Sequence, residues 1–264
     1  MAKAAFNFPL TGSLGDCSIY KMRGTDKLIL RSKGGPSKHK VLTEPTLEKM
    51  RLNMAEFSGC GKAASKILRA MTGLKHLADF NFSGNLAAIS KTIQKLDEVH
   101  NIGERSILFS EQKQILSGFN LNKQHPFDSV VKNSPSFSFS RNDLKVNLVF
   151  PTIFPKINIE SPWNLGYYRF IVVMGIIPDM ASTKYGYAQA SEEVTYNTVD
   201  DISGWYQLDL AAPRRNIELR LEDPVFLDET GSMVVSIGIE FGKMLNDTVQ
   251  PVKYTGCAKI LGLG

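Results

Sequence analysis

Two short runs near the beginning of the chain alternate apolar and polar residues. The first covers 14–22 and the second 27–33, and a Gly-Thr-Asp turn lies between them at 24–26. A period of two residues on either side of a glycine-containing turn is typical of a β-hairpin. Gly34, Gly35 and Pro36 end the second run. The pattern therefore predicts an N-terminal hairpin that precedes a helical stretch and is separate in sequence from any larger sheet.

A helical period follows the hairpin. Thr43 is a candidate N-cap, and Pro45 is tolerated in the first turn of the helix. The first apolar stripe at helical spacing consists of Leu47, Met50, Met54 and Phe57. The run Ser-Gly-Cys-Gly at 58–61 predicts a break, and two further helices are expected over 62–79 and 85–99. Stripes of this kind predict helices whose apolar sides form the core.

The residue pattern changes at about residue 105, where helical spacing fades and β-branched and aromatic residues begin to alternate with polar ones. The pattern predicts strands over 137–150, 169–175, 185–190, 204–210, 217–221, 233–243 and 258–261. Strands at this spacing, each with one apolar side, indicate an antiparallel β-sandwich. The predicted fold class is α+β, with a hairpin and three-helix region over 1–125 and an antiparallel β-sandwich domain over 135–264. The proline-containing segment 124–135 is the expected linker.

Positive charge is concentrated in the N-terminal half of the chain. Residues 1–130 hold 19 Lys and Arg against 11 Asp and Glu, whereas residues 131–264 hold 12 against 15. Three interpretations stay open. The basic hairpin residues can be solvent-facing charges that block unwanted strand pairing. The basic half can dock on the acidic half of a neighbouring copy, or the basic patch can contact nucleic-acid phosphates.

No segment carries a recognisable catalytic pattern. The run Gly-Cys-Gly-Lys-Ala at 59–63 lacks the first glycine of a phosphate-binding loop, and Ala63 stands where a Ser or Thr would hold Mg²⁺. Cys17, Cys60 and Cys257 are far apart in sequence, which favours reduced thiols over a disulfide framework or a zinc site. We therefore expect no enzymatic activity, no cofactor and no metal ion.

The N-terminal pattern is similar to one found in other bacterial sequences. Gly12-x-x-Gly15, Tyr20, a short basic turn and then Arg31-Ser-Lys-Gly-Gly resemble uncharacterised proteins of Bacteroidota. In these, a G-x-L-G…Y…G…R-x-K hairpin precedes a helix and a β-rich C-terminal half. The resemblance covers mainly residues 12–70, and segment 234–241 looks similar too. It implies a bacterial origin and the order of the elements, and it assigns no functional residue.

Two functions fit these patterns. The first is a non-enzymatic structural protein that assembles into a repetitive homo-oligomer or filament by strand exchange between subunits, because detached strands can complete a neighbour's sheet. The residues expected at that interface are Ile19, Tyr20, Lys21, Arg23, Lys27, Leu28, Arg31, Lys33, Ile260 and Leu261. The alternative is a monomeric binding module. It would stack a glycan on Trp163, Tyr167 and Trp205, or bind nucleic acid through the basic hairpin.

The sequence also bears on membranes and location. No apolar run is long enough to span a bilayer, and the first residues lack the apolar core of a secretory signal. The expectation is a protein with no membrane partner that is synthesised in the cytoplasm. An extracellular or particle-associated destination stays open.

Overall fold

The computed structural model describes residues 11–21, 27–194, 197–222 and 226–264. The chain divides into two compact units, Met1–Arg51 and Leu52–Gly264. The first unit contains a three-stranded antiparallel sheet of β1 (Gly12–Leu14), β2 (Cys17–Lys21) and β3 (Leu28–Ser32). The expected hairpin is confirmed by the pairing of β2 with β3. Its turn at 24–26 lies outside the described residues.

A short helix, α1 (Lys38–Thr43), follows the sheet and leads through the 3-10 turn η1 (Pro45–Leu47) into the long helix α2 (Glu48–Ala70). Thr43 is therefore not an N-cap but the last residue of α1. That helix is capped by Ser37, whose hydroxyl accepts a hydrogen bond from the backbone N–H of Lys40.

The predicted break at 58–61 is wrong, because α2 runs through this segment without interruption. Gly59 lies against the ring of Tyr187, and a Cβ atom at Gly59 would lie 2.5 Å from Tyr187 Cγ. This glycine therefore permits a close approach to a neighbouring side chain and does not end the helix. The other described helices are η2 (Thr72–Leu77), α3 (Ser83–Gln94), α4 (Lys113–Leu116), α5 (Phe127–Val130) and α6 (Pro155–Asn158).

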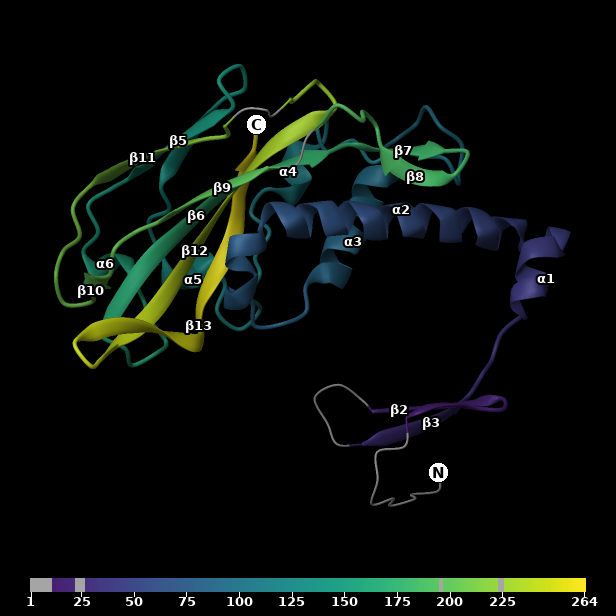
Figure 1. Cartoon of the computed structure of the whole chain (residues 1–264), viewed down its shortest axis with the longest axis horizontal. Coiled ribbons are helices and arrows are strands. Elements are labelled where there is room, and N and C mark those ends of the chain that lie inside the picture. The colour runs from purple at the N-terminus through teal and green to yellow at the C-terminus, as the bar shows by residue number, and fades with distance from the viewer. Residues whose placement is uncertain (1–10, 22–26, 195–196, 223–225) are drawn as a thin grey trace. The chain divides into compact units, whose positions relative to one another are not determined.

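Among the described residues of the second unit, two antiparallel sheets and a separate hairpin form the β-rich part (Figure 1). The larger sheet contains β6 (Tyr167–Pro178), β9 (Thr198–Ile202), β10 (Tyr206–Gln207), β12 (Gly231–Leu245) and β13 (Thr248–Leu263). Its strand order is β10–β6–β12–β13, and β9 also pairs with β6. The smaller sheet has the order β11–β5–β4, with β4 (Ser136–Ser140), β5 (Lys145–Phe150) and β11 (Arg215–Arg220). The hairpin consists of β7 (Met180–Thr183) and β8 (Gly186–Gln189).

Both faces of the larger sheet are buried. Alternate residues of β6 and β12, such as Val172 and Ile237, join one apolar cluster with Val146 of β5 in the smaller sheet. Val173 and Val234 point the other way and join a second cluster with residues of α2, η2 and α3. Figure 1 shows β5 and β11 on one side of the larger sheet and these helices on the other. Strands buried on both faces read as near-continuous apolar runs, which explains the unbroken run in β6.

The mixed α+β class is confirmed. The shared core of the two sheets is compatible with a β-sandwich, while α2, η2 and α3 add a helical layer on the outer face of the larger sheet. The predicted boundary at 125–135 lies inside the second unit. The expected linker contains α5, and Phe127, Val130 and Val131 there are buried in the core. The predicted strand 137–150 is two strands that pair as a hairpin.

Candidate functional site: the N-terminal sheet

The N-terminal sheet, defined here as β1, β2 and β3, separates apolar from polar side chains. Ile19 pairs with Leu30 and with Gly12, and Cys17 pairs with Leu14. Because residues directly opposite each other in an antiparallel pair project from the same face, one face gathers most of the apolar residues. We call it the apolar face; its apolar members are Leu14, Cys17, Ile19, Leu28 and Leu30, and the polar residues Lys21 and Ser32 lie on the same face at the ends of β2 and β3.

The apolar face is not covered by a core. No described residue between 11 and 40 is buried, and the first buried side chain after this segment is Val41. Leu14 is 73% exposed and Leu30 is 66% exposed. Small sheets need an apolar face packed on another surface to be stable in water, and chains of fewer than about 40 residues rarely fold without external support. The N-terminal sheet therefore lacks a stabilising partner surface among its own described residues.

The opposite face is more polar. Tyr20 pairs with Ile29, and Ser18 pairs with Arg31. Tyr20 is 43% exposed and Arg31 is exposed. Lys33, directly after β3, links the end of this strand to the turn between β1 and β2, because its ammonium group donates a hydrogen bond to the carbonyl of Gly15 at 2.9 Å.

Most of the expected interface residues of the hairpin lie on or beside this one sheet. Lys21 is the last residue of β2, and Lys27 immediately precedes β3. The remaining ones, Ile19, Tyr20, Leu28, Arg31 and Lys33, lie in the paired strands or directly after β3. Arg23 lies outside the described residues.

The two expected interface residues at the C-terminus lie elsewhere. Ile260 is fully buried and pairs with Ser236 of β12, and its backbone also bonds to Phe119 and Gly118. Leu261 packs against the core. The terminal strand is therefore paired within its own chain, which is the intramolecular arrangement, and Ile260 is not accessible to another molecule.

A second unpartnered apolar surface lies on α2 and was missed by the sequence reasoning, which assigned it to the core. We call it the α2 stripe: Leu47 of η1 with Met50, Met54 and Phe57 of α2. Met50 is 42%, Met54 53% and Phe57 64% exposed. The buried residues of α2 occur at 56, 59, 60, 63, 64, 67 and 70. At 100° per residue, the centre of this set lies about 140° around the helix axis from the centre of the stripe. The helix therefore has two apolar sides, of which one faces the core.

The aromatic residues proposed for glycan stacking are engaged in packing. Trp163 packs on Phe241 with ring centroids 5.1 Å apart, and the His125 ring lies 5.2 Å from it. Trp205 is covered by the guanidinium group of Arg169, 4.5 Å from the ring centroid. Tyr167 lies at the start of β6, half-buried. Both tryptophan rings therefore have packing partners within the chain.

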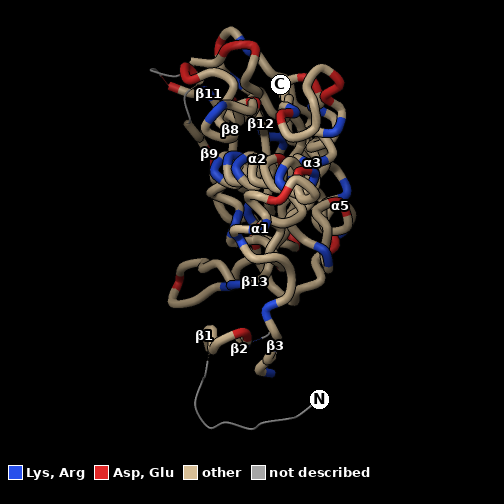
Figure 2. The backbone as a smooth tube through the Cα atoms, turned by 90° about the vertical axis from the view of Figure 1, so that its right-hand side faces the viewer, with Lys and Arg blue, Asp and Glu red and all other residues tan. Residues whose placement is uncertain are grey.

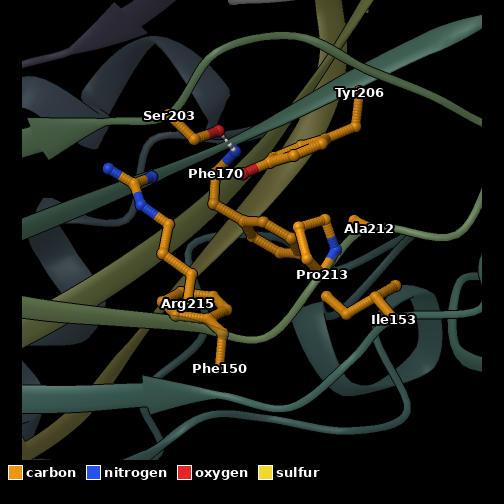
Figure 3. Close-up of a pocket in the computed structure, with 8 residues that line it drawn as sticks. All are labelled: Phe150, Ile153, Phe170, Ser203, Tyr206, Ala212, Pro213 and Arg215. Atoms are coloured by element: carbon orange, nitrogen blue, oxygen red, sulfur yellow. Dashed lines mark hydrogen bonds between the residues drawn. The ribbon is translucent and has the colours of Figure 1, made fainter.

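A pocket opens between the two sheets (Figure 3). Its lining is mostly apolar and includes Phe150, Phe170 and Pro213, with Arg215 at one side. The Ser203 hydroxyl accepts a hydrogen bond from the backbone N–H of Phe170 at 3.0 Å and is already occupied. The cavity volume is about 10 Å³, which is roughly the space that one water molecule needs. We interpret it as a packing gap at the edge of the core.

A buried charge network is the most heavily bonded polar feature. Glu56 of α2 is fully buried, and its carboxylate accepts hydrogen bonds from Arg105 Nε at 2.7 Å, from the backbone N–H of Gly103 at 2.9 Å and from Lys91. Burial alone would raise its pKa, but these donors lower the pKa to about 2. Gln94 continues the network toward Tyr187. Because the Glu56 carboxylate is fully buried and its hydrogen bonds link α2 to α3 and to the segment that follows α3, the network has the geometry of a structural brace.

The chemistry of metals and thiols adds no further site. No group of three or more His, Cys, Asp or Glu side chains that could hold a metal ion is found in the described part of the chain. Cys17, Cys60 and Cys257 are free thiols. Burial raises the pKa of Cys60 to about 11 and that of Cys257 still further, whereas Cys17 lies half-buried on the apolar face. Cys17 is therefore the accessible thiol.

Comparisons with known proteins give no further guide to function: no family model, curated protein or solved structure matches this chain. No described helix combines the length and the apolar character that crossing a bilayer requires.

Proposed function

We propose that this protein is a non-enzymatic structural subunit that assembles with copies of itself by exchanging the N-terminal sheet between subunits. The observation that carries the proposal is the uncovered apolar face: five apolar side chains on a sheet in which no described residue is buried. Burying apolar surface is worth about 25 cal/mol per Å², so covering this face on another molecule provides a driving force for assembly.

Charge favours contact between different parts of two copies over contact between two N-terminal sheets. The first unit holds 10 Lys and Arg against four Asp and Glu, whereas the rest of the chain holds 21 against 22. Two first units, each with an excess of positive charge, repel one another. Basic and acidic residues alternate along the backbone of the larger unit (Figure 2), and this unit is nearly neutral. Contacts between unlike surfaces generate rings or open filaments, and reciprocal exchange generates dimers.

The alternative of a monomeric glycan-binding module gains no support, because Trp163 and Trp205 already pack within the chain. Nucleic-acid binding by the basic sheet predicts a steep loss of affinity with added salt, so a titration against a nucleic acid at low and moderate salt separates it from assembly.

Light scattering on matched charge variants tests the proposal. Leu30→Glu places a carboxylate on the apolar face, and Ser18→Glu places the same charge on the opposite face. Leu30→Glu is expected to reduce the weight-average mass of the purified full-length protein, with Ser18→Glu retaining the assembly of the wild type. Equal masses for the two variants would contradict a role for the apolar face.

A further inference from the structure

The α2 stripe and the apolar face are two exposed apolar surfaces of one chain, and they match in size. From Leu47 to Phe57 the stripe is about 15 Å long, at a rise of 1.5 Å per residue. A five-residue strand such as β2 or β3 is about 17 Å long, at 3.3 Å per residue. The helix can therefore lie along the sheet with its apolar residues in contact over their full length.

We propose that the α2 stripe of one copy is the docking surface for the apolar face of the N-terminal sheet of a second copy. This inference rests on the proposed function, since it names the surface that receives the exchanged sheet. The segment 44–58, which carries the stripe, holds Lys49 and Arg51 against Glu44, Glu48 and Glu56, so the basic sheet meets no accumulated positive charge there. The charge balance favours this acceptor over the N-terminal sheet of another copy.

The area of the contact determines how copies must be arranged. Two strands of five residues and one of three cover about 200 Å², so one sheet–helix contact buries roughly 400 Å² counted over both partners. Stable interfaces bury at least about 1,000 Å² in total. A single contact therefore falls well short, whereas two copies that exchange sheets reciprocally make the contact twice, bury about 800 Å² and approach that value. The reciprocal dimer is therefore the smallest assembly in which the two surfaces come near the area of a stable interface.

Cross-linking between two different full-length copies tests the acceptor directly. One copy is the wild type, which presents Cys17 on the apolar face. The other carries Cys17→Ser with Met54→Cys, so that its accessible thiol is on the stripe. Cys60 and Cys257 are fully buried in both copies. After the copies are mixed and allowed to exchange, a short bis-maleimide is expected to give a covalent heterodimer of twice the chain mass.

The matched control moves the thiol around the helix. Ala55 is exposed and adjacent in sequence to Met54, but it lies about 100° away from it around the helix axis. A copy with Cys17→Ser and Ala55→Cys is expected to cross-link several-fold less than the Met54→Cys copy. Equal yields from the two positions would overturn the assignment of the stripe.

A second pair of variants keeps the proposal testable without cross-linking. Phe57→Glu changes an exposed stripe residue, and Ala55→Glu adds the same charge at an exposed position off the stripe. We expect Phe57→Glu to reduce the mass of the assembled protein at least twofold, with Ala55→Glu unchanged and both variants unfolding at the wild-type temperature.

The outcomes separate this inference from the proposed function. If wild-type assemblies persist but neither Met54→Cys cross-linking nor sensitivity to Phe57→Glu is seen, the stripe is not the acceptor and self-assembly stands. If the wild type is monomeric at all concentrations, the proposed function itself fails. A single chain that keeps Cys17 and carries Met54→Cys supplies the last check: a cross-linked product that migrates as a monomer means that the sheet docks in its own chain, and the inference is overturned.

Discussion

Among single residues, Glu56 is the one on which most polar contacts converge. Its carboxylate is fully buried and accepts hydrogen bonds from Arg105, Lys91 and the backbone of Gly103. Removing one member of such a buried network leaves the remaining charges without a partner, which typically costs about 3–5 kcal/mol. The bonds join α2, α3 and the loop that follows α3, so this residue ties the helical layer together.

We predict that Glu56→Gln lowers the free energy of unfolding by about 3 kcal/mol at pH 7. The pKa of Glu56 is lowered from 4.5 to about 2, so its contribution is complete above pH 4.5 and is lost as the pH falls toward 2. The measurement is urea denaturation of both proteins between about pH 2.5 and pH 7. Their difference should shrink as the pH falls, and a difference that is independent of pH would contradict the ionic role of Glu56.

The stability contributed by Asp179 depends on pH in the opposite direction to that of Glu56. It is buried, and desolvation raises the pKa of its carboxyl group from 3.8 to about 6, despite hydrogen bonds from the backbone and hydroxyl of Ser110. A raised pKa in the folded state means that the stability contributed by Asp179 is present below pH 3.8 and is lost as the pH rises through 6. Asp179→Asn removes this titration.

We therefore expect the stability of Asp179→Asn, relative to the wild type, to rise by about 2–3 kcal/mol between about pH 4 and pH 7, since each pKa unit corresponds to about 1.4 kcal/mol. Denaturant titrations at the two pH values check this. A constant difference between the two proteins would show that Asp179 does not titrate over this range.

At the scale of elements, the long helix α2 was the least predictable part of the fold. Its two glycines have different environments. Gly59 faces the Tyr187 ring, where an added Cβ would clash, whereas Gly61 is exposed and no atom lies within 4 Å of an added Cβ. Helix propensity alone favours Ala over Gly by about 1 kcal/mol at both positions.

The two glycines supply a matched prediction. Gly59→Ala is expected to destabilise the protein by about 1–3 kcal/mol, because overpacking at Tyr187 outweighs the gain in helix propensity. Gly61→Ala is expected to stabilise it by about 0.5–1 kcal/mol. Chemical denaturation of the two variants measures both effects, and a stabilised Gly59→Ala would refute the packing role of Gly59.

The sequence predicted strands better than helices for a physical reason. Alternation with period two located β11, and runs of apolar residues located β6 and β12, to within a few residues, because the burial of a strand's faces is written in its own residues. Alternation also marked β4 and β5 but merged them into one strand. The glycine pair in α2 looked like a break, since the Tyr187 ring that requires one of them is 128 residues away in sequence. The short strands β7 and β9 were missed, as their residues carry little alternation.

The candidate site was partly visible in the sequence. The N-terminal hairpin and its apolar alternation were predicted and are present in β2 and β3. Alternation within the hairpin does not show whether another element covers its apolar face. Whether Met54 and Phe57 lie in the core depends on which of the two apolar sides of α2 packs against the larger sheet. Periodicity does not distinguish these sides. The Glu56 network was equally hidden, because its members lie 35 to 49 residues apart.

At the scale of the whole molecule, an exposed apolar sheet and an exposed apolar helix side occur in one chain of 29.3 kDa. We propose that exchange between copies covers both surfaces at once. Self-association of this kind is measured by the mass of the protein in solution.

The most direct test is the mass of the purified full-length wild type, measured by multi-angle light scattering over a wide range of protein concentrations. The account predicts a species of at least twice the chain mass of 29.3 kDa, shifting toward the monomer on dilution. A single species at the mass of one chain at every concentration would contradict it.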